Sequence, residues 1–238
     1  MKAQVFSATT SDLPGQSSEI NLDGNGQINT AQKADGRQTT ARRPAGWQPR
    51  RVFLFSGHMI DAPDRPEPRF PASQEAVAAW AISVTLDTLG AGPEDLALCS
   101  GACGGDILFA EACLRRGVRL DLRLPFAVPA FLEKSVSFAG ESWRTRFCAI
   151  KDNPLTSLSI MPDEAGTAPV DANPYERTNL WLLQSALAWG EEKVHFICLW
   201  NRQGGDGPGG TGHMHDEVNR RTGQVHVLDT NILFIRPR

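Results

Sequence analysis

The chain has 238 residues, of which 41% are hydrophobic, and a formal net charge of −3 at pH 7. Residues 1–50 carry six basic and four acidic side chains, which leaves 24 − 6 = 18 basic against 27 − 4 = 23 acidic in the remainder. A body this acidic argues against general nucleic-acid binding, which needs cations to neutralise phosphates. The length fits one α/β domain with a tail, or two small domains.

Cysteine usage and hydropathy restrict the class of protein further. The five cysteines are odd in number and include no C-x-x-C pair, so buried reduced thiols are expected rather than a disulfide framework or a zinc site. The first 25 residues lack the apolar core of a signal peptide, and the longest apolar stretch, near residues 76–86, is too short to span a bilayer. We therefore expect a cytoplasmic protein without a membrane partner.

The first 48 residues are rich in Ser, Thr, Gln, Gly, Asn and Asp and show no hydrophobic periodicity. Such a segment cannot bury enough apolar surface to offset its ordering entropy. We expect residues 1–48 to form a flexible polar tail and residues 49–238 to form a single folded domain.

From residue 51 onward, apolar runs alternate with helical patterns. Strands are expected over residues 52–55, 96–99, 118–124, 155–160, 194–200 and 225–228. Helices are expected over residues 73–89, with Ser73 as N-cap, 107–116, 129–138, 141–149, 175–190, and from the second glycine loop to about 221. Charges alternate with leucines over residues 118–124, which predicts a strand near a sheet edge with its charges in water. The alternation as a whole predicts an α/β, Rossmann-like fold, with a mostly parallel sheet and helices on both faces.

Two glycine-rich turns each join a predicted strand to a predicted helix, at residues 101–106 and 204–217. Glycine lets the backbone approach a ligand, and a helix N-terminus offers free N–H groups to an anion. Because ligands bind at the carboxyl ends of parallel strands, the turn at residues 56–58 is expected to join the same site. The candidate ligand-binding residues are Ser56, Gly57, His58, Arg65, Arg69, Gly101, Gly104, Gly105, Asp106, Gly207, Gly209, Gly210, Thr211 and Gly212.

Each candidate also has a purely structural interpretation. Gly104 and Gly105 are consistent with close helix–strand packing, and Asp106 with either a ribose hydroxyl partner or a plain N-cap. Arg65 and Arg69 are consistent with bidentate phosphate donors or with solvated loop arginines. His213 and its neighbours do not match the H-E-x-x-H zinc pattern, so no metal ligands and no cofactor are assigned.

One segment resembles a known family. The run Pro208-Gly209-Gly210-Thr211-Gly212 through Asp216 is similar to the P-G-G-x-G-T-x-x-E signature of the LOG ("Lonely Guy") and lysine-decarboxylase-like proteins of the SLOG superfamily. His213 stands where that family has threonine, and Asp216 where it has the glutamate linked to N-glycosidic cleavage. The stretches FSGHMIDAP, GGDILFAEA and NPYERTN extend the resemblance over roughly residues 52–230, toward a bacterial SLOG-type group often attached to repeat or signalling modules.

The resemblance implies a Rossmann-like domain that binds or senses a nucleotide or NAD-derived ligand. An alternative is a nucleotide N-glycosidase or phosphoribohydrolase in which Asp216 or Glu217 is the catalytic acid or base. A protein-interaction module, or a homo-oligomer of the domain, stays open. The departure at Asp216 favours binding over catalysis.

Overall fold

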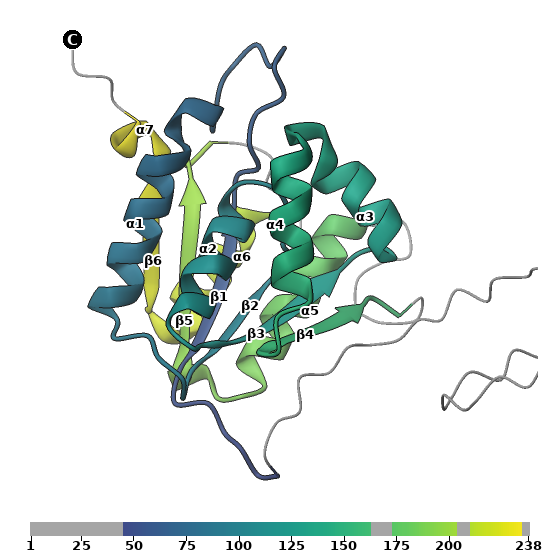
Figure 1. Ribbon diagram of the computed structural model, residues 1–238. Coiled ribbons are helices and arrows are strands. Elements are labelled where there is room, and N and C mark those ends of the chain that lie inside the picture. The colour runs from purple at the N-terminus through teal and green to yellow at the C-terminus, as the bar shows by residue number, and fades with distance from the viewer. Residues whose placement is uncertain (1–44, 163–172, 204–209, 235–238) are drawn as a thin grey trace, which may run out of the picture. The chain divides into compact units, whose positions relative to one another are not determined.

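The computed structural model describes residues 45–162, 173–203 and 210–234 (Figure 1). The strands are β1 Val52–Gly57, β2 Leu96–Cys99, β3 Arg119–Leu124, β4 Thr156–Ile160, β5 Val194–Trp200 and β6 Val225–Asp229. The helices are α1 Glu75–Thr88, α2 Gly105–Arg115, α3 Val128–Ser135, α4 Glu141–Lys151, α5 Pro174–Leu187, α6 Thr211–Thr222 and α7 Thr230–Leu233. Short 3₁₀ turns cover Ala72–Gln74, Ser137–Ala139 and Glu191–Lys193.

The six strands form one sheet in the order β4-β3-β2-β1-β5-β6, and every pairing is parallel. This confirms the predicted single α/β, Rossmann-like domain. The chain builds outward from β1 through β2 and β3 to β4, and then returns to place β5 on the other side of β1. The strand order therefore reverses between β1 and β5, the kind of position where parallel sheets bind ligands.

Helices cover both faces of the sheet. Successive side chains of β1 point alternately into the two core layers between the sheet and these helices. Phe53 and Phe55 of β1 belong to the core cluster that α1, α2 and α4 cover, in front of the sheet in Figure 1. Val52 and Leu54 belong to the second cluster, which α5 and α6 cover from behind. Because each central strand is apolar on both faces, these strands read as continuous hydrophobic runs.

Residues 118–124 are expected near a sheet edge with their charges in water, and only the second part is wrong, because β3 lies next to the edge strand β4. β3 pairs with both β2 and β4, and Asp121 is buried at 8% exposure. On β3, Arg123 lies over the ring of Trp181 of α5, with 4.3 Å from its Cζ to the ring centroid. The polar face of the strand therefore does not face water. It is covered by α5, whose Trp181 supplies an aromatic surface to Arg123.

The starts of α1 and α5 are capped differently. Ser73 lies in the 3₁₀ turn and does not cap α1, whose N-cap Gln74 makes no side-chain capping bond, so this prediction is wrong. Asn173 is the N-cap of α5, and its Oδ1 accepts a 3.0 Å hydrogen bond from the Tyr175 N–H. α5 thus begins with a capped first turn, which fixes the positions of the side chains around it.

The predicted tail lies almost wholly outside the described residues. Trp47 packs edge-on against Trp189, with ring centroids 6.2 Å apart, and the Arg50 guanidinium donates to the Asp95 carboxylate. The chain is therefore joined to the sheet from Trp47 onward. No described helix has both the length and the apolar character that crossing a membrane requires.

All five cysteines are free thiols, as predicted. Cys99, Cys103 and Cys113 are buried in the first core cluster, Cys198 is buried in the second, and Cys148 on α4 is partly exposed. Burial raises the pKa of Cys103 and of Cys198 to about 12. These thiols are therefore protonated and serve as small apolar side chains.

Candidate functional site

A cavity of about 260 Å³ opens at the carboxyl ends of β1 and β2. Side chains from both strand ends and from four helices or their N-caps surround it. The lining residues are Phe55, Ser56, Gly57, Met59, Ser100, Ala102, Asp106, Phe131, Asn173, Tyr175, Glu176, Asn179, Gly210 and Thr211. The structure thus brings together Ser56, Gly57, Asp106, Gly210 and Thr211 from the set predicted by sequence.

Three helices begin at this cavity. The first turn of α2 contributes Asp106, that of α5 contributes Tyr175 and Glu176, and α6 contributes its N-cap Gly210 and its first residue Thr211. The first N–H groups of a helix have no partner within the helix, and its dipole is positive at that end. Converging N-termini make the cavity suited to an electron-rich ligand group.

Asp106 is the buried charged group in the cavity wall. Its Oδ2 accepts hydrogen bonds from the N–H groups of Gly101, at 3.0 Å, and Ala102, at 3.3 Å. Burial raises the pKa of the Asp106 carboxyl to about 7, and the backbone donors of the loop only partly oppose this. Near neutral pH the carboxyl exchanges between its charged and neutral forms, so it can accept or donate a hydrogen bond to a ligand.

A hydroxyl pair links the two halves of the sheet at the cavity. Ser56 Oγ, at the end of β1, lies 2.9 Å from Thr211 Oγ1, at the start of α6. Ser56 is only 8% exposed, so this contact replaces solvent for its hydroxyl. The pair fixes the start of α6 against the strand at the reversal point of the sheet.

Tyr175 supplies an aromatic surface beside the cavity. Its hydroxyl lies 3.0 Å from Oγ of the buried Ser135, and its ring packs edge-on against Phe126 with centroids 5.7 Å apart. The side chain remains 38% exposed. A held, partly exposed ring of this kind can stack on a planar ligand group.

The glycines after β2 are fixed by packing. Gly104 has φ +100°, and a Cβ there would lie 2.7 Å from Ile60 N and 2.9 Å from His58 O. Gly105 donates its N–H to His58 O at 3.1 Å, and Gly101 has φ +84° with Phe147 beside it. None of these three glycines is among the residues that line the cavity. They hold the turn after β1 against the start of α2.

His58 and the two loop arginines lie on the other side of β1. The Asn201 N–H donates to His58 Nε2 at 3.1 Å, which ties the end of β1 to the end of β5. Burial, followed by the charge of Arg69, lowers the pKa of His58 to about 4. Arg65 and Arg69 line a second cavity, also of about 260 Å³, which shares no lining residue with the first.

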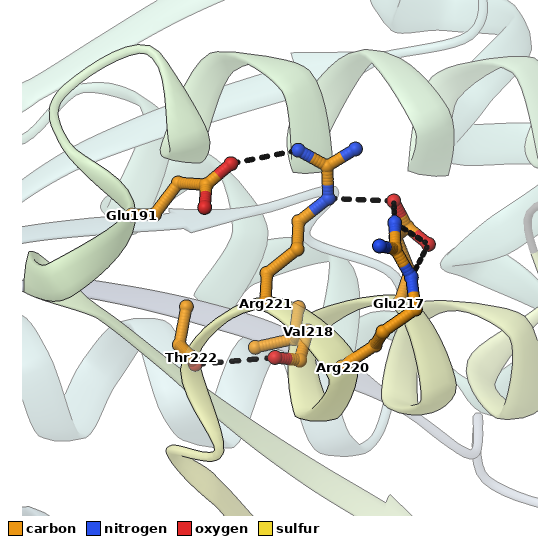
Figure 2. A network of polar contacts seen from close by, with 6 residues as sticks. All are labelled: Glu191, Glu217, Val218, Arg220, Arg221 and Thr222. Atoms are coloured by element: carbon orange, nitrogen blue, oxygen red, sulfur yellow. Dashed lines mark hydrogen bonds and ion pairs between the residues drawn. The ribbon is translucent and has the colours of Figure 1, made fainter.

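The two predicted catalytic carboxylates lie on α6, outside the set of described residues that line the cavity. Asp216 has an 84% exposed side chain and pairs with His215 at 2.9 Å. Glu217 binds Arg220 and Arg221, and Arg221 also binds Glu191, as Figure 2 shows. These contacts lower the pKa of Glu217, so its carboxylate stays charged and paired.

The remaining predicted residues are Gly207, Gly209 and Gly212 of the second glycine-rich turn. Gly212 is buried inside α6, whereas Gly207 and Gly209 lie outside the described residues. Met59, Ser100 and Phe131 line the cavity but were not predicted. Ser100 directly precedes a predicted glycine turn, which is a usable signal, but Met59 and Phe131 look like ordinary apolar residues in the sequence.

Within the described residues, no group of three or more His, Cys, Asp or Glu side chains is placed to hold a metal ion. No family model and no curated protein matches the chain. Two solved structures of the Moco carrier protein from Chlamydomonas reinhardtii show 14% and 13% identity, each with a TM-score of 0.31. Each match covers 77% of this chain, and the two matches cover 91% and 92% of the carrier-protein chains. At this level of similarity they identify neither a family nor a ligand.

Proposed function

We propose that this protein binds a nucleotide or NAD-derived ligand in the cavity at the carboxyl ends of β1 and β2, and acts as a binding or sensing domain. The observation that carries the proposal is the convergence of the starts of α2, α5 and α6 on that cavity. The helix dipoles are positive at these three starts, so they favour a phosphate in the cavity without a basic side chain.

The side chains around the cavity suit the rest of a nucleotide. Asp106, held by two backbone donors and titrating near neutrality, matches a ribose hydroxyl, which can both donate and accept. Tyr175 supplies a ring for a base, and Asn173 and Asn179 supply amides beside it. The described lining includes two carboxylates, Asp106 and Glu176, in the first turns of α2 and α5. The first turn of α6 holds no acidic residue, so the ligand's anionic group belongs near the start of α6.

Binding is favoured over the alternative of N-glycosidic hydrolysis. Asp216 lies five residues beyond Thr211, roughly 7.5 Å along the helix axis at 1.5 Å per residue. Glu217 is neutralised by two arginines. A catalytic carboxylate must reach the reacting atoms within hydrogen-bond distance. If the protein does turn over a ligand, Asp106 is a carboxyl already in the cavity wall, with a pKa suited to acid–base work.

The proposal is tested by ligand-dependent melting with AMP, ADP-ribose and NAD. A ligand that binds only the native state raises the melting temperature by mass action. Gly210 has φ −65° and ψ 167°, a conformation that any residue adopts, so Gly210→Val places a side chain at the cavity without backbone strain. We expect the variant to fold and to lose the ligand-induced shift.

Gly92→Val is the matched control, because a Cβ at Gly92 meets nothing within 4 Å and the residue lies outside the cavity lining. It should keep the full shift. An unchanged melting temperature for the wild type with every ligand, or an equal response of the Gly210 variant, would disprove the proposal. Release of free base that disappears in Asp216→Asn or Glu217→Gln would establish the hydrolase instead.

A further inference from the structure

The loop between β1 and α1 is closed at its base by a set of hydrogen bonds. Asp61 donates its N–H to Phe70 O at 2.9 Å, and Asp61 Oδ2 accepts from the N–H groups of Arg69, at 2.9 Å, and Phe70, at 2.7 Å. Phe70 is fully buried and stacks on Phe234 with centroids 5.5 Å apart. Both ends of the loop are therefore fixed to the domain.

Within the loop, the backbone has little freedom. Pro63, Pro66 and Pro68 each fix one φ angle, and the Arg65 N–H donates to Ala62 O at 3.1 Å. Arg65 Nε donates to Glu67 O at 2.9 Å and lies 3.3 Å from Asp61 Oδ1. The Arg65 side chain, held in this way, loses less entropy on binding a ligand than a free surface arginine does.

The loop presents its arginines to the second cavity together with amide side chains from the loop after β5 and from α7. Asn201 and Gln203 follow β5, and Asn231 lies in α7, after β6. The full described lining is Arg65, Glu67, Pro68, Arg69, Asn201, Gln203 and Asn231. This cavity thus also lies at the carboxyl ends of strands, on the β5 and β6 side of the reversal point.

The two arginines lie close enough to His58 to lower the pKa of its imidazole, although burial lowers it more. The charges of Arg69 and, less strongly, Arg65 help burial to keep the pKa of His58 low, although Asp61 opposes them. Asn201 contacts His58 Nε2 through its backbone N–H, at 3.1 Å, and through its Oδ1, at 3.2 Å, and the low pKa of His58 leaves the imidazole neutral near pH 7. His58 therefore adds no positive charge of its own and reports on the charge beside it.

We propose that the second cavity is an oxyanion site, with Arg65 and Arg69 as charged donors and the amide of Gln203 as a neutral one. The Asn231 amide already donates to Asn201 O at 2.6 Å and so holds the wall of the cavity. The ligand class is a phosphate group, either free phosphate or the phosphate of an ester. Guanidinium forks match the oxygen spacing of phosphate. Glu67 faces the same cavity and weakens binding by repulsion, which makes it a built-in limit on affinity. The site is separate from the nucleotide cavity and does not depend on it.

The test is titration of the full chain with inorganic phosphate, followed by the NMR signals of the His58 ring and by calorimetry. We expect saturable binding in the millimolar range and a rise in the pKa of His58, because a bound anion offsets the arginine charges. Arg65→Gln should weaken binding about tenfold, and Glu67→Gln should strengthen it. Arg144→Gln, which removes one exposed arginine on α4, should change nothing.

Two further arms separate this site from the first cavity and identify the source of the phosphate. Gly210→Val should leave phosphate binding intact, and loss of binding in that variant would place the anion in the first cavity and overturn the proposal. Equal weakening by Arg144→Gln, or an unmoved His58 signal at saturation, would overturn it as well. ADP-ribose that moves the His58 signal where adenosine does not would identify an esterified phosphate as the ligand, whereas inorganic phosphate acting alone would identify the free ion.

Discussion

The turn after β2 and the start of α6 look alike in sequence, since each joins an apolar strand to a helix through glycines, but they use glycine differently. At Gly104 the backbone has φ +100°, and any Cβ would strike the main chain of the turn after β1. At Gly210 the backbone is extended, and the residue faces a cavity. A glycine in a strand–helix turn therefore marks either a packing contact or a ligand surface, and only its conformation and neighbours decide which.

The largest effect is expected from replacing the packing glycine. Gly104→Ala combines backbone strain of about 1–3 kcal/mol with an overlap against main-chain atoms of similar cost, for a loss near 4 kcal/mol in the free energy of unfolding. Gly210→Ala should cost less than about 1 kcal/mol, because its backbone is not strained. Urea denaturation of both variants measures the difference, and equal losses would refute the distinction between the two turns.

Asp106 gives the next largest effect, and it depends on pH. Its pKa is raised from 3.8 to about 7 in the folded chain, so the native state favours the protonated form. Stability relative to Asp106→Asn is therefore greatest below pH 4 and falls through pH 7, by up to roughly 4 kcal/mol at about 1.4 kcal/mol per pKa unit. Unfolding both proteins at a series of pH values checks this, since parallel stability curves would mean that the carboxyl is not perturbed.

The hydroxyl pair that joins β1 to α6 should have a smaller effect. Thr211→Val keeps the side-chain volume but removes the hydroxyl that contacts Ser56 at 2.9 Å, for a loss of about 1 kcal/mol. A double-mutant cycle with Ser56→Ala isolates the contact, because a shared interaction makes the two losses less than additive. Strict additivity would show that the hydroxyls do not interact.

The smallest effect belongs to the ion-pair network on α6. Glu217→Gln removes the carboxylate that binds Arg220 and Arg221, but these pairs face solvent and are screened by salt. We expect the melting temperature to fall by less than about 2 °C and the difference to disappear in high salt. A larger loss that persists in salt would contradict a surface network, and would point to a buried function for Glu217.

The sequence predicted most of the fold because the central strands are apolar on both faces. β5 was predicted with its observed bounds, residues 194–200. The expectation that the charges of β3 face water is wrong, because alternating charges indicate which face is polar and cannot show that Trp181 covers it. That contact joins residues far apart in the chain, which no local pattern contains.

The candidate site was predictable where it follows strands and not where it depends on packing. Ser56, Gly57 and Asp106 follow or face strand ends, and the parallel topology brings them together. Phe131 reaches the cavity from α3, whose place in the fold depends on the crossover between β3 and β4. The sequence also could not show that the candidate residues divide between two cavities, because this depends on which side of β1 each loop folds.

The buried cysteines allow the two layers of the domain to be compared by chemistry. Cys99, Cys103 and Cys113 lie in the layer under α1, α2 and α4, and Cys198 lies in the layer under α5 and α6. A maleimide or disulfide reagent reaches each thiol only after its own layer opens, and Cys148 reacts early as an internal reference. Mass spectrometry of the labelled peptides over time would therefore rank the opening rates of the two layers and show which of them a bound ligand closes.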